Sequence, residues 1–254
     1  MFVSCSTLCF ARYSLEDALL AIAALEFSKV DVAIRANSHQ LTPQEVVEDT
    51  HKVMRRLKLT STLVPAAFSI ELEENNAEVF DEQFRAICKL ARLLTVATIS
   101  MPAAPLGADW DAEVKRLKHL VHIASADSVN LNVETRMGTL TEWPDQAVKL
   151  CERVPGLGLT LDPSHYICGP NQNRNYDHVF PYVRHVHLRD TGRTPDKLQV
   201  RVGQGELEYS RLVSLLERYR YDRLLSVEIF DGMQLPFNVE SEVRKLKYLL
   251  DSLA

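Results

Sequence analysis

Four apolar, β-rich segments of this 254-residue chain carry acids or histidines at or near the point where each segment ends. One reads LTLDPSH, and the others read LNVETR, VRHVHLRD and LLSVEIF. A charge inside an apolar run is costly unless it is paired or binds a metal. The residues concerned are Glu134, Asp162 with His165, His185 and His187 with Asp190, and Glu228.

Two glutamates, one aspartate and one histidine provide mostly oxygen ligands, which suit one Mn²⁺, Mg²⁺ or Co²⁺ and also accommodate Zn²⁺. A single acid at a strand end is more often an ion-pair partner or a helix cap. Four such residues on successive segments instead predict a metal site. His185 and His187 face the same way along a strand, and His187 is favoured as the ligand because it lies nearer the strand end. His39, after an earlier segment, is a candidate substrate contact.

Eight β-rich runs alternate with helical patterns, which predicts one (β/α)₈ TIM barrel domain over residues 1–254. Helix starts are marked by Ser14 with Asp17 and by Thr42-Pro43-Gln44-Glu45. A doubly wound open sheet is the alternative, but no GxGxxG follows the first run. In a parallel barrel all strands point their C-terminal ends at one face, where active sites lie. The predicted strands are Phe2–Ser6, Val30–Ile34, Thr62–Ala66, Thr95–Ser100, Val129–Glu134, Leu157–Asp162, Val183–Leu188 and Arg223–Ile229.

Composition argues against several other classes of protein. The net charge of -5 disfavours a sequence-independent DNA binder, which needs a basic footprint. The five cysteines form no CxxC, and their odd number and scatter suggest free thiols in a reducing compartment. The first ten residues lack a basic region, and the chain contains no run of 18 apolar residues. We therefore expect a cytoplasmic protein that binds neither membranes nor nucleic acid.

On these motifs the chain resembles the xylose isomerase-like barrels, in particular the sugar phosphate isomerase/epimerase group that includes D-tagatose 3-epimerase. The resemblance extends over the whole chain and is strongest over residues 129–230. Two departures are Leu140, which stands where the epimerases carry a second glutamate, and the absence of the usual glutamate at the end of the second strand. The resemblance implies one metal held by Glu134, Asp162, His187 and Glu228, with His165, Arg193 and Asp190 at positions of the family's substrate-site motifs.

The implied reaction is proton abstraction next to the carbonyl of a sugar, sugar phosphate or related polyol, through an enediolate. Glu134 and Glu228 would remove and return the proton, while His165 and Arg193 would stabilise the oxyanion or orient hydroxyls. Arg189 could bind an acidic group of the substrate.

Three alternatives stay open. The first is a dehydratase of the inosose or dehydroshikimate type. The second is a non-catalytic barrel that binds metal and ligand. The third, an AP endonuclease-like phosphodiesterase, is disfavoured because the segments PAAFSI and ISMPAAP hold no histidine for a three-metal cluster. The expected partner is a small-molecule sugar or polyol, and the sequence is also compatible with a homo-oligomer.

Overall fold

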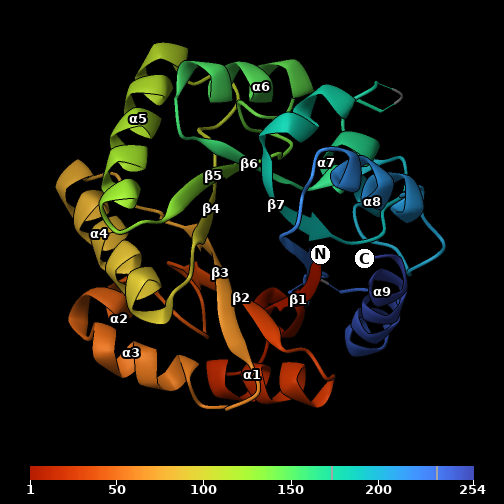
Figure 1. Ribbon diagram of the computed structural model, residues 1–254, viewed down its shortest axis with the longest axis horizontal. Coiled ribbons are helices and arrows are strands. Elements are labelled where there is room, and N and C mark those ends of the chain that lie inside the picture. The colour runs from red at the N-terminus through yellow and green to blue at the C-terminus, as the bar shows by residue number, and fades with distance from the viewer. Residues whose placement is uncertain (173, 233) are drawn as a thin grey trace.

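A computed structural model describes residues 1–172, 174–232 and 234–254, and within them parallel strands close into a barrel that helices surround (Figure 1). Each strand pairs with the next along the chain, and β8 pairs back with β1. The predicted TIM barrel is therefore confirmed. The strands are β1 Phe2–Ser6, β2 Lys29–Arg35, β3 Val64–Glu71, β4 Thr98–Pro102, β5 Asn130–Glu134, β6 Gly158–Leu161, β7 Val183–Leu188 and β8 Leu224–Val227.

The helices cover the outside of the barrel, and the two chain ends lie near each other beside β1 and α9 (Figure 1). An apolar layer between strands and helices forms the core. Short 3₁₀ helices occupy Thr7–Phe10, Asp177–Tyr182 and Pro195–Lys197. The α-helices are α1 Leu15–Ala24, α2 Pro43–Glu48, α3 Thr50–Leu57, α4 Ala77–Leu94, α5 Trp110–Ala126, α6 Pro144–Arg153, α7 Pro163–Cys168, α8 Tyr209–Arg218 and α9 Val239–Leu253.

Both predicted helix caps are present. The Ser14 hydroxyl accepts a hydrogen bond from the Asp17 backbone N–H at 3.1 Å at the start of α1. At the start of α2 the Thr42 hydroxyl accepts from the Glu45 N–H, and the Glu45 carboxylate accepts from the Thr42 N–H at 2.8 Å. These contacts satisfy N–H groups that have no partner within the helix.

Six of the predicted strands, all but β1 and β7, differ in their bounds from the structure, and the shifts of β3 and β6 bear on the site. β3 begins at Val64 rather than Thr62 and continues to Glu71, because its register with β2 extends to the pair Arg35 and Glu71. Pairing with a neighbouring strand thus overrides the weak β-propensity of the Ala-Ala step. β6 ends at Leu161, one residue early, because Asp162 caps α7.

The interior of the barrel contains a polar layer below its mouth. Ser4, Asp31, Asn132 and Ser226 are each fully shielded from solvent and come from four different strands. Barrel interiors are usually filled by branched apolar side chains. Here, Asp31 Oδ1, the hydroxyls of Ser4 and Ser226 and both amide atoms of Asn132 have no hydrogen-bond partner among the described residues. The layer places a buried carboxylate, that of Asp31, directly beneath the predicted site.

Candidate metal and active site

Three of the predicted ligands meet at the C-terminal mouth of the barrel. Glu134 ends β5, His187 lies near the end of β7, and Glu228 directly follows β8. His187 Nδ1 lies 2.9 Å from Glu134 Oε1 and 3.5 Å from Glu228 Oε1. One ligand atom from each residue falls within 4.8 Å of the others. Three strands that are distant in sequence therefore present two carboxylates and one imidazole to a single point.

Asp31 holds the far side of the same imidazole. His187 Nε2 lies 3.1 Å from Asp31 Oδ2, and His185 Nε2 lies 2.7 Å from the same oxygen. The rings of His185 and His187 meet edge to face at 4.9 Å. Because Asp31 takes the Nε2–H of His187, Nδ1 is the nitrogen presented to Glu134 and Glu228. This carboxylate–histidine arrangement is the one that commonly orients a metal-binding imidazole.

The buried charges of this cluster shift one another. Burial alone would raise the pKa of Asp31, but hydrogen bonds from His185 and His187 outweigh it and hold that pKa well below its usual range. Burial would likewise raise the pKa of Glu134, and His187 lowers it. Burial would lower the pKa of His187, yet Glu228, Asp31 and Glu134 raise it well above its ordinary value. Each shift favours charged groups that bind one another.

Asp162 lies in a different environment from the other three predicted ligands. Its Oδ1 accepts from the Ser164 N–H at 2.9 Å and from the Ser164 hydroxyl, and its Oδ2 forms an ion pair with Arg189. Arg189 also donates from Nε to the Ser164 hydroxyl at 3.0 Å. Both oxygens of Asp162 are therefore engaged within the chain. The guanidinium of Arg189, which the sequence predicts to bind an acidic group of the substrate, is buried against Asp162.

His165 lies beside this ion pair. Its Nδ1 accepts from the Met137 N–H at 3.4 Å, and its Nε2 lies 3.7 Å from Asp162 Oδ2 and 3.3 Å from Arg189 Nη2. Burial lowers the pKa of His165 and outweighs the charge of Asp162, which raises it. The structure thus favours a neutral imidazole in the first turn of α7.

The remaining predicted substrate contacts either lie farther from the site or form hydrogen bonds with backbone N–H groups. Asp190 is buried, and its carboxylate accepts from the N–H groups of Thr191, Gly203 and Gly205, so it organises the loop after β7 and has no free oxygen for substrate. Arg193 is 64% exposed and pairs with Glu206 at 2.8 Å. His39 is exposed at the edge of a cavity of about 520 Å³ that Arg35, Glu71 and Phe230 also line.

Sequence reasoning missed two residues of the site. Asp31 interrupts the apolar run KVDVAI, which is the same signal that identified the other acids. Arg136 stands two residues after Glu134 in the sequence; its pKa is raised because Glu134, Glu71 and Glu228 outweigh the lowering effect of burial. Because Arg136 follows the expected ligand Glu134 by only two residues, its positively charged side chain could have been predicted to lie near the site.

The Glu134, His187 and Glu228 cluster fits a divalent cation. Two carboxylates converge on one imidazole, and Glu228 Oε2 is buried with no hydrogen-bond partner among the described residues. An ionised carboxylate oxygen left in this way needs a counter-charge, and oxygen and imidazole ligands suit Mg²⁺, Mn²⁺, Co²⁺ and Zn²⁺. Asp162 lies next to the cluster but is not within the 4.8 Å group.

The sequence profile of the xylose isomerase-like TIM barrel matches residues 19–249. The chain belongs to this family. Its fold and the position of its acids at the C-terminal mouth agree with that membership, and no curated protein matches the chain at a significant level.

Solved structures with the same fold resemble the xylose isomerase-like chain over nearly its full length. The probable 3-DHS dehydratase AsbF from Bacillus anthracis has a TM-score of 0.76 at 16% identity, with 99% of each chain covered. D-allulose 3-epimerase from Methylomonas sp. has a TM-score of 0.77 at 13% identity, covering 100% of this chain and 98% of its own. The IOLI protein, solved with a bound zinc atom, has a TM-score of 0.75 at 17% identity, with 100% and 98% covered. At these identities the likeness shows the fold.

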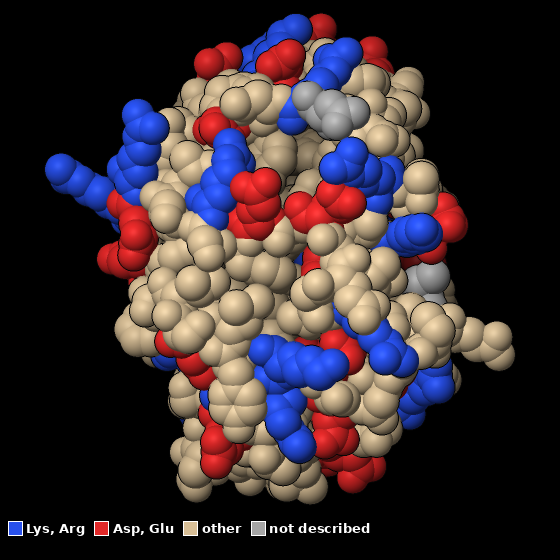
Figure 2. Space-filling model, turned by 90° about the vertical axis from the view of Figure 1, so that its right-hand side faces the viewer, with Lys and Arg blue, Asp and Glu red and all other residues tan. Residues whose placement is uncertain are grey.

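The molecular surface is relevant to nucleic acid and membranes, which the sequence predicts not to be partners. Lysine and arginine are interspersed with aspartate and glutamate on the face seen in Figure 2, without a broad basic patch there. None of the described helices combines the length and the apolar character that a membrane crossing requires.

Proposed function

We propose that this chain is a divalent-metal-dependent isomerase or epimerase that acts on a sugar, sugar phosphate or related polyol by moving a proton next to a carbonyl. One observation carries the proposal: the carboxylates of Glu134 and Glu228 converge on His187 Nδ1 from two different strands. When bound, a cation held by Glu134, His187 and Glu228 would act as a Lewis acid on the substrate carbonyl. Family membership supports this class of reaction.

The two glutamates supply the proton chemistry. One takes the proton from the carbon next to the carbonyl, and the other returns a proton to the enediolate. Asp31 keeps the Nε2 proton of His187 and so holds the imidazole in one orientation. The buried surroundings exclude water, which strengthens each electrostatic contact.

His165 is the proposed substrate contact. Its lowered pKa favours a neutral ring, and the tautomer that accepts from the Met137 N–H at Nδ1 carries an Nε2–H that can donate to an oxygen of the substrate. Arg189 Nη2, which can only donate, lies 3.3 Å from the same Nε2, so in this role the substrate oxygen takes the place of that contact.

The test is solvent exchange of a carbon-bound hydrogen. Protein loaded in turn with Mg²⁺, Mn²⁺, Co²⁺ or Zn²⁺ is incubated in D₂O with keto-sugars, inososes and their phosphates, the metal is then removed, and deuterium is read by NMR. We expect incorporation at the carbon next to the carbonyl. His165→Asn should keep its metal and lose about 10²-fold or more in turnover, whereas His122→Asn, on the exposed face of α5 and outside the cavity lining, should not change it.

Absence of deuterium alone could reflect direct, shielded transfer of the proton. The proton-shuttle mechanism is wrong if, in addition, the α-deuterated substrate shows no isotope effect in single-turnover chemistry and His165→Asn turns over at the wild-type rate.

A dehydratase is the second candidate. It shares the proton-abstraction step and then expels a β-hydroxyl. Leu140 favours it, because a buried apolar side chain stands where the epimerases carry a second glutamate. The same NMR experiment separates the two outcomes, since water loss produces new olefinic carbons and epimerisation produces a stereoisomer.

A further inference from the structure

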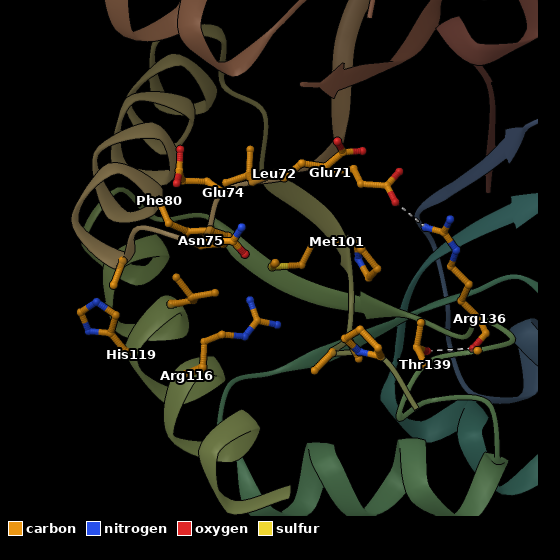
Figure 3. Close-up of a pocket in the computed structure, with 18 of the residues that line it drawn as sticks. Glu71, Leu72, Glu74, Asn75, Phe80, Met101, Arg116, His119, Arg136 and Thr139 are labelled. Carbon is orange, nitrogen blue, oxygen red and sulfur yellow. Dashed lines mark hydrogen bonds and ion pairs between the residues drawn. The ribbon is translucent and has the colours of Figure 1, made fainter. Parts of the chain in front are cut away.

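A cavity of about 720 Å³ opens beside the candidate site, between the ends of β3, β4 and β5 and the helices α4 and α5 (Figure 3). Cavities of about 300–1,000 Å³ typically hold drug-sized ligands, so this one exceeds what a single sugar ring would fill. Figure 3 shows Glu71 and Arg136 at one end of it, Met101 in the middle, and Phe80, Arg116 and His119 at the other end.

The end with Arg136 adjoins the reacting groups. Arg136 follows Glu134 by two residues, and its charge acts on Glu134 and Glu228. Met137, the next lining residue, donates its N–H to His165 Nδ1. Pro102, also in the lining, is paired with Glu134 in the register of β4 and β5. A ligand whose reacting end lies at Glu134 can therefore extend past Arg136 into the cavity.

At this inner end arginine side chains meet the carboxylates of the site, and Glu134, Glu71 and Glu228 all act on Arg136. Arg136 Nη1 lies 3.1 Å from Glu71 Oε1, and Arg35 Nη1 lies 3.4 Å from Glu71 Oε2, so two guanidinium groups share one carboxylate. Glu71 is the hydrogen-bond partner of the Arg136 side chain among the described residues, and it engages only one of the five N–H donors of the guanidinium. The free donors can bind a carboxylate or a phosphate in a planar fork.

Apolar side chains line the middle of the cavity beyond Arg136, while charged and polar side chains, Asp81, Arg116 and His119 among them, line its outer end. Leu72, Met101, Ala103, Phe80 and Leu120 provide its apolar lining. Three acids at the rim have partners within the chain. Asp81 pairs with His119 at 2.6 Å, Glu73 accepts from Asn37 at 2.7 Å, and Glu74 accepts from the Asn76 N–H at 2.7 Å.

We infer that the substrate is an amphipathic anion: a carboxylate or phosphate near its reacting end binds Arg136, and an apolar portion extends over Met101 toward Phe80. The inference rests on the proposed function for the position of the reacting end. It narrows the substrate from any sugar to an acidic polyol or hydroxy-ketone that carries an apolar extension.

The test uses three probes that need no knowledge of the substrate: 4-phenylbutanoate, the neutral 4-phenylbutan-1-ol, and acetate. Protein labelled with ¹³C at the methionine methyl groups is titrated with each probe. We expect 4-phenylbutanoate to shift the signals of Met101 and Met137, which line the cavity, and to leave Met54 on α3 unchanged. It should bind at least about tenfold more tightly than the alcohol or acetate, the scale of one charge-assisted hydrogen bond.

Variants assign that preference to residues. Arg136→Gln should remove the preference for the acid over the alcohol, Arg136→Lys should keep part of it, and Phe80→Gln should weaken both aromatic probes. The matched controls are Arg218→Gln on α8 and Leu106→Gln, an exposed leucine outside the cavity lining; both should bind as wild type. Repeating the titration with inorganic phosphate and phenyl phosphate shows whether the cavity prefers a phosphate or a carboxylate.

The inference is overturned if acid and alcohol bind equally, if the shifts fall outside Met101 and Met137, or if Arg136→Gln keeps the preference. Glu228→Gln distinguishes it from the proposed function, because that variant should lose deuterium exchange and still bind 4-phenylbutanoate. Protein that binds the probe as described but never exchanges deuterium would refute the proposed function and leave the anion-binding cavity standing.

Discussion

Asp162 and Glu228 are buried to nearly the same degree, at 0% and 4% exposure, yet their charges are balanced in different ways. Asp162 receives two hydrogen bonds from Ser164 and an ion pair from Arg189. Glu228 lies 3.5 Å from His187 through one oxygen, and its other oxygen has no partner among the described residues. The chain compensates the first carboxylate by itself, whereas the second has room for a cation from outside.

From this contrast we propose that Asp162 is a structural carboxylate and that Glu228 is a metal-binding one. A buried carboxylate whose oxygens are all engaged must give up existing contacts before it can bind a metal, while one with a free oxygen need not. It also bears on the family resemblance, which assigns Asp162 and Glu228 alike to the metal. Substitutions at Asp162 and at Glu228 should therefore change different properties, stability at the first position and metal affinity at the second.

The largest effect is expected from Glu228→Gln. Replacing one of three converging ligands with a neutral amide should weaken Mn²⁺ binding about 1,000-fold or more, which corresponds to about 4 kcal/mol. Isothermal titration of metal-stripped protein measures the affinity directly. Saturating Mn²⁺ should also raise the melting temperature of the wild type but not that of the variant, because a ligand that binds only the folded state stabilises it. Wild-type metal affinity in Glu228→Gln would refute the assigned site.

Asp162→Asn should lose stability rather than metal affinity. The substitution leaves the buried Arg189 without its counter-ion, and breaking one partner of a buried pair costs about 3 kcal/mol or more. Urea unfolding in the presence of a chelator measures this loss. The double variant Asp162→Asn/Arg189→Met should recover much of it, since no uncompensated charge then remains. If Asp162→Asn instead weakens Mn²⁺ binding as much as Glu228→Gln and unfolds like wild type, Asp162 is a ligand and the contrast drawn here fails.

Asp31→Asn should have a smaller effect on the metal. Losing the acceptor that holds His187 Nε2–H should weaken Mn²⁺ binding about 10- to 100-fold, the usual scale for the partner of a metal-binding histidine. ¹⁵N NMR of the histidine rings in metal-free protein should at the same time show a lower pKa for His187, because Asp31 is one of the carboxylates that raise it. Asn132→Asp places a carboxylate elsewhere in the same polar layer and serves as the control. Reduced affinity with an unchanged pKa of His187 would show that Asp31 acts only through packing.

Arg193→Gln should have the smallest effect. Its side chain is largely exposed and its pair with Glu206 is open to solvent, so the melting temperature should stay unchanged. Once a substrate is known, any increase in KM for this variant would indicate that the loop after β7 moves toward the site. Wild-type kinetics would instead confine Arg193 to the surface.

Much of this site could be predicted because strand ends can be read locally. Alternating and apolar runs identify β5 and β8, and an acid at the end of each run identifies Glu134 and Glu228. Once the alternation of strands and helices predicts a parallel barrel, the carboxyl ends of all strands must lie on one face. The convergence of these two acids with His187 therefore follows from sequence pattern together with fold topology.

The partner of each charge was decided only by the tertiary structure. Nothing in the sequence near Asp162 distinguishes a metal ligand from a partner of Arg189, and Asp31 reaches His187 across 156 positions of sequence. Local sequence sets the periodicity of an element and the residue types it exposes, but which buried charge meets which depends on strand register and on the tilt of strands that are distant along the chain. Burial then fixes these pairings, because a carboxylate shielded from water must have a partner.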